Sequence, residues 1–172
     1  MAELFYLAKI GEINLKKGNL KDFERRLAQN FRSYFDGTPP NVQVRAGRMY
    51  VRADVSLQPR VEAALNHLFG ITSWAQAKPA DKTLEAISAT AVAEACILQA
   101  QGARTFKIEA RRADKQFPLT SYDIAREVGG TIHTAGILTV DVHNPDAVIS
   151  IEVREKKAFI YGVEHIGRRG LP

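Results

Sequence analysis

The chain has 172 residues, enough for one or two compact domains, and its 45% hydrophobic and 25% charged residues are ordinary for a globular protein. No apolar run approaches the roughly 18 residues of a membrane span. The N-terminus has no basic segment ahead of an apolar stretch, so no secretory signal is expected. The single cysteine, Cys96, excludes an internal disulfide and is expected to be buried and inert in its alanine-rich segment. These features predict a cytoplasmic protein with no membrane anchor.

The net charge of +5 is compatible with nucleic-acid binding, but its distribution matters more than its sum. Residues 1–75 carry eleven Lys and Arg against seven Asp and Glu, and residues 76–172 carry thirteen against twelve. The second half is therefore nearly neutral, and its basic residues are clustered.

The first half predicts a β-α-β-β-α-β order, which is typical of a ferredoxin-like split βαβ unit. Its helices are expected to begin at the N-caps Asn19 and Ser56, the second ending at Gly70. Residues Phe23, Leu27, Phe31 and Tyr34 form the inward stripe of the first helix. The expected elements are a strand at 4–10, a helix at 19–35, a hairpin of 42–45 and 48–52, a helix at 56–69 and a strand at 71–77.

The second half predicts an α/β domain with a mixed sheet, so the whole chain is α+β. Asp81 or Thr83 caps its first helix, and Thr120 and Asp123 stand at capping-box spacing before its second. The expected elements are helices at 83–101 and 121–133, strands at 106–111 and 137–142, and a hairpin of 147–154 and 158–163. We expect domains at 1–77 and 78–166, with 167–172 beginning a linker.

The sequence contains no complete catalytic or metal-binding motif. Gly129-Gly130 lacks the spacing and the Lys-Ser/Thr pair of a phosphate-binding loop. The four histidines are scattered, with no cysteine or carboxylate at ligand spacing. We therefore expect no catalytic residues, metal ligands or cofactor in this chain. A small phosphatase or acyl-transfer enzyme, and an interaction scaffold without an RNA role, are the alternatives from other classes.

A basic segment from Phe106 to Pro118 is the most informative stretch. It predicts a strand that delivers Arg111 and Arg112 at its end, with Lys115 in the loop before a capped helix. Guanidinium groups bind phosphate oxygens bidentately, and helix N-termini add donors for the same anion. Phe117 could stack on an unpaired base or simply pack beside Pro118. The alternative is a solvated rim whose charge Glu109 and Asp114 balance. Further candidates for RNA contact are Lys107, Arg104, Arg154, Lys16, Lys17 and Arg48.

The second half resembles the THUMP domain, an RNA-binding domain of tRNA- and rRNA-modifying enzymes. The first half is similar to the N-terminal ferredoxin-like domain of the tRNA 4-thiouridine synthase (tRNA sulfurtransferase) family. The resembling segments of the second half are residues 106–118, 121–132, 140–146 and 149–161, and those of the first are 9–16, 47–51 and 69–71, together with Asn19, Phe23 and Glu24. The family usually has an aromatic residue at the position of Ile10.

The resemblance implies a module that grips the acceptor stem and 3′ end of a tRNA. It implies that a separate domain or subunit thiolates a uridine with ATP and Mg²⁺, a chemistry linked in this family to thiamine synthesis. That domain needs a Ser-Gly-Gly-x-Asp-Ser loop, which this chain lacks. A homodimer is compatible with this arrangement. A THUMP module serving a methyltransferase or pseudouridine synthase is the nearest alternative.

Overall fold

The computed structural model describes residues 2–11 and 17–168, which divide into two compact units. Unit 1 contains the chain up to Gln76 and again from Glu164, and unit 2 is Ala77–Val163. The predicted boundaries of 77 and 166 stay a prediction, but residues Glu164 to Arg168 group with the first unit. No helix in the described part of the chain is long and apolar enough to cross a membrane.

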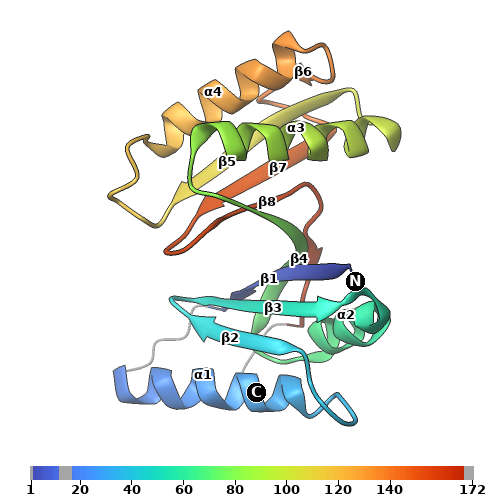
Figure 1. Cartoon of the computed structure of the whole chain (residues 1–172), viewed down its shortest axis with the longest axis vertical. Coiled ribbons are helices and arrows are strands. Elements are labelled where there is room, and N and C mark those ends of the chain that lie inside the picture. The colour runs from blue at the N-terminus through green and yellow to red at the C-terminus, as the bar shows by residue number, and fades with distance from the viewer. Residues whose placement is uncertain (1, 12–16, 169–172) are drawn as a thin grey trace. The chain divides into compact units, whose positions relative to one another are not determined.

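Unit 1 has the predicted β-α-β-β-α-β order, with one short strand added from the end of the chain (Figure 1). Its strands run in the order β2-β3-β1-β4, and β9 pairs with β4. The elements are β1 (Glu3–Ile10), α1 (Lys17–Arg32), β2 (Asn41–Arg45), β3 (Arg48–Asp54), a 3-10 turn (Val55–Leu57), α2 (Gln58–His67), β4 (Ile71–Ala80) and β9 (His165–Ile166).

The core of unit 1 lies between the two helices and the sheet. Phe23, Leu27 and Phe31 are buried as predicted, but Tyr34 lies beyond the end of α1 and is 38% exposed. The predicted N-caps are wrong. Asn19 lies inside α1, which begins at Lys17. The Asp54 side chain, and not that of Ser56, accepts a hydrogen bond at the start of the turn before α2.

Unit 2 has a mixed sheet with two helices packed in one core (Figure 1). The order is β8-β7-β5-β6, with the last residues of β4 on the outer edge of β8. Strand β5 is parallel to β6 and β7, whereas β7 and β8 form the predicted antiparallel hairpin. The elements are α3 (Leu84–Ala100), β5 (Thr105–Arg112), α4 (Ser121–Thr134), β6 (Thr139–Val140), β7 (Ala147–Val153) and β8 (Ala158–Tyr161).

The helix ends of unit 2 follow the predicted chemistry closely. Thr83 caps α3 by accepting a hydrogen bond from the Ala86 N–H. Thr120 and Asp123 form the predicted capping box of α4. The α+β class with a mixed sheet in the second half is confirmed. One prediction about α3 is wrong, because Cys96 lies on its exposed face and is not buried.

Candidate nucleic-acid interface

The two arginines at the end of β5 lie on opposite faces of the sheet. Successive side chains of a strand alternate between faces. Phe106 is in the core under the helices, so Arg112 shares that face and Arg111 takes the other. Arg112 donates from Nη1 to the Phe117 carbonyl oxygen at 2.9 Å. Arg112 therefore fixes the following loop, while Arg111 is exposed and lies in register with Glu152.

An ion pair holds the loop after β5 in place. Lys82 bonds the Asp114 carboxylate and also donates to the Glu155 carbonyl oxygen at 3.0 Å. The hydrogen bond from Lys82, followed by one from the Gln116 N–H, holds the pKa of the Asp114 carboxyl below its ordinary value. Lys82 is therefore already paired and is not available to a phosphate. Lys115, in the same loop, is exposed and forms no ion pair with the described residues.

The β7–β8 turn also contains one lysine in an ion pair and one exposed lysine. Lys157 pairs with Asp81 at 2.6 Å, and this contact lowers the pKa of the Asp81 carboxyl. Lys156 is exposed and has no ion pair within the described ranges. The cations available to a phosphate at this end of unit 2 are therefore Arg111, Lys115 and Lys156.

Two predicted contact residues are buried. Phe117 is 6% exposed and belongs to the core of unit 2, which supports the packing alternative and not base stacking. The Arg154 side chain is 8% exposed and lies 3.7 Å from the carboxylates of both Glu152 and Glu155. Because neither side chain is presented to solvent, neither is placed to contact a phosphate or a base.

The N-terminus of α4 is less suited to a phosphate than the sequence suggests. The Thr120 hydroxyl accepts a hydrogen bond from the Asp123 N–H at 3.1 Å, and the Asp123 carboxylate accepts one from the Thr120 N–H at 3.4 Å. The capping box therefore uses two donors and adds a negative charge where an anion would bind.

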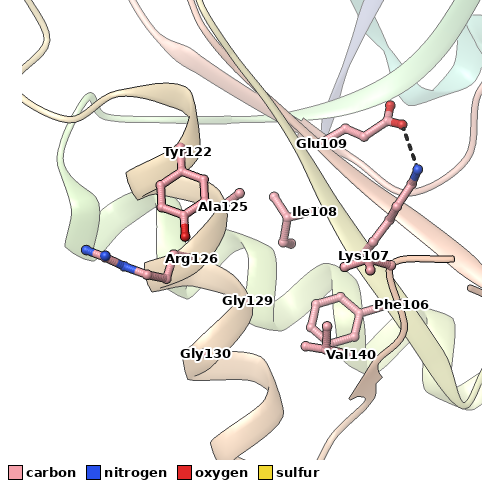
Figure 2. A pocket seen from close by; sticks show the side chains of 11 residues that line it. Phe106, Lys107, Ile108, Glu109, Tyr122, Ala125, Arg126, Gly129, Gly130 and Val140 are labelled. Atoms are coloured by element: carbon pink, nitrogen blue, oxygen red, sulfur yellow. Dashed lines mark ion pairs between the residues drawn. The ribbon is translucent and has the colours of Figure 1, made fainter.

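A groove of about 540 Å³ lies between α4 and β5 (Figure 2). Tyr122 is 72% exposed at one end, and Val140 and Val142 are exposed at the other. Gly130 has open space where a Cβ would stand, and a Cβ on Gly129 would only touch Ile108 at 3.6 Å. The glycine pair thus leaves a largely apolar floor uncovered.

Charged groups border the groove. Lys107 pairs with Glu109 at 3.3 Å. The Arg126 side chain is 61% exposed, and its guanidinium lies 5.8 Å from the Tyr122 ring centroid, 3.5 Å from the Glu127 carboxylate and 3.7 Å from that of Asp123. An aromatic ring beside an arginine, over an apolar floor, is the arrangement that accepts an unpaired nucleobase and its phosphate.

The groove was missed by sequence reasoning, although one signal for it was present. A Gly-Gly pair inside a helix lowers helix stability relative to alanine and leaves the helix surface without side chains there. The spacing around Gly129-Gly130 argues against a phosphate loop, and it does not show that Tyr122 points outward. Among the described residues no cluster of three or more His, Cys, Asp or Glu could hold a metal ion.

The remaining predicted cations are spread widely. Arg104 is exposed just before β5, and its backbone N–H donates to Asp146 at 2.9 Å. Seven residues of extended strand, about 23 Å, separate Arg104 from Arg111. In unit 1, Arg48 lies at the β2–β3 turn and donates to the Gly47 carbonyl oxygen at 3.2 Å. Lys16 lies outside the described residues, and Lys17 begins α1 with no side-chain placement.

Family models match both units. Residues 5–75 match the ThiI ferredoxin-like domain, and residues 81–163 match the THUMP domain. The chain is a ThiI ferredoxin-like domain joined to a THUMP domain. The groove and the cations at the end of β5 therefore belong to the THUMP domain, and Arg48 belongs to the ferredoxin-like domain.

Several known proteins are similar to nearly the whole of this chain. A probable tRNA sulfurtransferase of Treponema pallidum (strain Nichols) is 53% identical over 97% of this chain, and one of Moorella thermoacetica is 38% identical over 96%. The chain spans 42% of the length of each. The crystal structure of a 4-thiouridine synthetase–RNA complex with bound ATP has a TM-score of 0.81 at 29% identity, covering 99% of this chain and 44% of that one.

Proposed function

We propose that this chain binds the acceptor stem and unpaired 3′ end of a tRNA and positions a uridine for thiolation. The observation that carries the proposal is the open groove beside Tyr122 in the THUMP domain, with exposed cations at the end of the neighbouring strand β5 that form no ion pair with any described residue. The groove would take an unpaired nucleotide, and the cations would contact the phosphates of the stem. The sulfurtransferase names of the relatives and the RNA in the similar structure support this assignment.

We assign the thiolation chemistry to a separate domain or subunit outside these 172 residues. ATP and Mg²⁺ would bind there, as would the sulfur donor, and this module would supply substrate recognition in the cytoplasm. A homodimer and a link to thiamine synthesis are further proposals on the same basis. Finding a Ser-Gly-Gly-x-Asp-Ser loop in the sequence after Pro172 would support this assignment, and a methyltransferase domain there would overturn it.

The groove is tested with two RNA hairpins of the same stem, one with an unpaired 3′ overhang and one blunt. Tyr122→Ala should weaken binding of the overhang RNA at least fivefold, since stacking of one base is worth about 1–3 kcal/mol. Binding of the blunt RNA should not change. Tyr122→Phe, which keeps the ring, is the matched control. Equal losses for both RNAs would overturn the groove assignment.

The phosphate contacts are tested by the salt dependence of the same binding. With about five contacts, log K against log salt should have a slope of about −4 to −5 for duplex-like RNA. Removing Lys115 and Arg111 together should make the slope shallower by about two. Lys157→Ala is the matched control, because Asp81 already pairs with that charge. A flat salt dependence of the unaltered chain would contradict the proposal.

A further inference from the structure

One side of β5 has a stretch of backbone with no strand beside it. Strand β6 contains only Thr139–Val140 and pairs with Thr105 and Phe106. The Asp141 N–H then donates to the Phe106 carbonyl oxygen at 2.8 Å. The Asp141 carboxylate accepts hydrogen bonds from two N–H groups of the residues after it, both at 3.1 Å, so the chain turns away from β5 at this point. Beyond Phe106, no described residue pairs with β5 on this side.

The backbone N–H and C=O groups of Ile108 face this open side. Successive residues of a strand direct these groups to alternate sides of the strand within the sheet. The Phe106 carbonyl oxygen faces β6, so Ile108, two residues further on, faces the same way. Lys107 and Glu109 face β7, with which β5 pairs along most of its length. Ile108 therefore presents a donor and an acceptor side by side that bond to no described residue.

The groove between α4 and β5 reaches this backbone. Ile108 is one of the residues that line the groove, and it is half-buried (Figure 2). Its side chain points toward α4, where a Cβ on Gly129 would stand 3.6 Å from it. A ligand in the groove would therefore meet the Ile108 donor and acceptor on a largely apolar floor, where a hydrogen bond is stronger than in water.

The Watson–Crick edge of a nucleobase carries the matching groups. This edge has an amino group beside a ring nitrogen in adenine and cytosine, and a ring N–H beside a carbonyl oxygen in guanine and uracil. Proteins that bind unpaired RNA often hydrogen-bond this edge while an aromatic side chain stacks on the base. A peptide strand could pair with the same backbone, but the Tyr122 ring and the Arg126 cation at the same groove favour a base and its phosphate.

We infer that the Ile108 backbone binds the Watson–Crick edge of the nucleobase in the groove. This inference rests on the proposed function and adds the reason why the groove selects an unpaired end. Stacking on Tyr122 does not distinguish a free base from a paired one, because every base has a π-face. The Watson–Crick edge is free only in an unpaired base, since in a duplex it bonds to the partner base. The Ile108 backbone is therefore the part of the groove that excludes a paired end.

The RNA side of the test uses the stem hairpin with one uridine as its 3′ overhang. A methyl group on the ring N–H of that uridine blocks its Watson–Crick edge, whereas a methyl group on the ring carbon C5 leaves this edge intact. Both methylated rings can still stack on Tyr122. The N-methylated overhang should bind at least about fivefold more weakly than the unmodified one, because its hydrogen bonds to Ile108 are lost, and the C-methylated overhang should bind within about twofold. Equal binding of the two methylated RNAs would overturn the inference.

The protein side of the test follows amide hydrogen exchange by NMR. In the free chain, the Ile108 N–H should exchange fast because it has no partner, while the N–H groups of Lys107 and Glu109, which face β7, should exchange slowly. The overhang RNA should slow the exchange of the Ile108 N–H at least about tenfold, and the blunt hairpin should not. A slowly exchanging Ile108 N–H in the free chain would contradict the open edge without the use of any RNA.

A proline at position 108 removes the donor itself. Ile108→Pro leaves the pairing with β7 in place, because proline is tolerated where the N–H of a strand points away from its partner strand. It should weaken binding of the unmodified overhang RNA about fivefold or more and leave binding of the blunt hairpin unchanged. Ile108→Val, which keeps the N–H and most of the side chain, is the matched control. If the proline variant folds poorly, the methylated RNAs and the exchange of the Ile108 N–H still decide.

The outcomes separate this inference from the proposed function. If Tyr122→Ala weakens overhang binding while the two methylated RNAs bind alike and the Ile108 N–H still exchanges fast, the base stacks without an edge contact. The inference then fails and the proposed function stands. If the unaltered chain binds no overhang RNA, the proposed function fails and the inference fails with it.

Discussion

Arg111 and Arg112 are adjacent in sequence but have different surroundings and therefore different expected roles. Arg112→Ala should lower the free energy of unfolding by about 1–3 kcal/mol, because a charged donor to the Phe117 carbonyl oxygen is lost. Arg111→Ala should leave that free energy nearly unchanged and make the salt slope of RNA binding shallower by about one. Urea unfolding and a salt series measure the two effects. If Arg111→Ala lowered the free energy of unfolding and Arg112→Ala changed only the salt slope, these two roles would be wrong.

The pKa of Asp114 provides a second test at this scale. Lys82→Met should raise the pKa of this carboxyl toward its ordinary value of about 3.9, because the largest cause of its lowering is removed. A carboxyl with a lowered pKa in the folded state stabilises that state at neutral pH, and this contribution is lost as the pH falls below about 4. In the unaltered chain, protonation of Asp114 in acid lowers the free energy of unfolding. In the Lys82→Met variant, the fall in this free energy between neutral pH and acid should therefore be smaller.

Carboxyl carbon NMR titration measures this pKa directly. Lys156→Ala is the control, since no ion pair of Lys156 is present in the described part of the chain, and it should not move the Asp114 pKa. An Asp114 pKa that stays low in the Lys82 variant would show that the backbone hydrogen bond from Gln116 suffices.

Residue-level roles were predictable where they depend on local spacing and not where they depend on tertiary contacts. Thr120 and Asp123 are three residues apart in a capping box, and the sequence shows this directly. Whether Cys96, Phe117 or Arg154 is buried depends on packing between segments distant in sequence. The sequence predicts Arg111 and Arg112 as a pair at the strand end, and the structure separates them because β5 includes both and its side chains alternate between faces.

Helix α4 carries the groove, so its N-terminus provides a test at the scale of an element. Thr120→Ala should destabilise the THUMP domain by about 1 kcal/mol, because the Asp123 N–H loses its partner. Thr134→Ala, at the other end of the same helix, is the matched control and should be neutral or slightly stabilising. Thermal unfolding measures both. Equal destabilisation by the two variants would show that the capping box contributes nothing special.

The elements themselves were largely predictable from periodicity. The strand pattern from Phe106 to Arg111 and the hairpin of β7 and β8 correspond to observed elements. The start of α1 was not predictable, because Asn19 is a good cap in isolation and lies inside the helix. Strand β9 was not predicted either, since two residues have no period and their pairing depends on a partner 91 residues away.

At the scale of the whole molecule, the two units have separate cores with no residue in common. Leu27 is fully buried in the first, so Leu27→Ala should lower the stability of unit 1 by about 2–5 kcal/mol. Hydrogen exchange should then increase in β1, α1 and β3, while β5 and β7 stay protected. A uniform increase over both units would show that they unfold together.

The order of the two domains was predictable from the resemblance of each half to a known family, because each half has its own local pattern. The return of the chain to unit 1 was not. The sequence predicts a linker from residue 167, since Gly167-Arg168 has the composition of one. Only the three-dimensional position of Ile71 shows why a glycine is needed there.

The pairing of β9 with β4 also affects the order in which the chain can fold during its synthesis. A ribosome adds about 5–20 residues per second, so the 91 residues between the partners take roughly 5 to 18 s to synthesise. Throughout that interval the first unit exists without its last strand, and the edge of β4 at Ser73 and Trp74 is open to any other extended segment nearby. The newborn chain is thus most exposed to wrong strand partners while its second unit is still being made, and it is completed only when the last few described residues emerge.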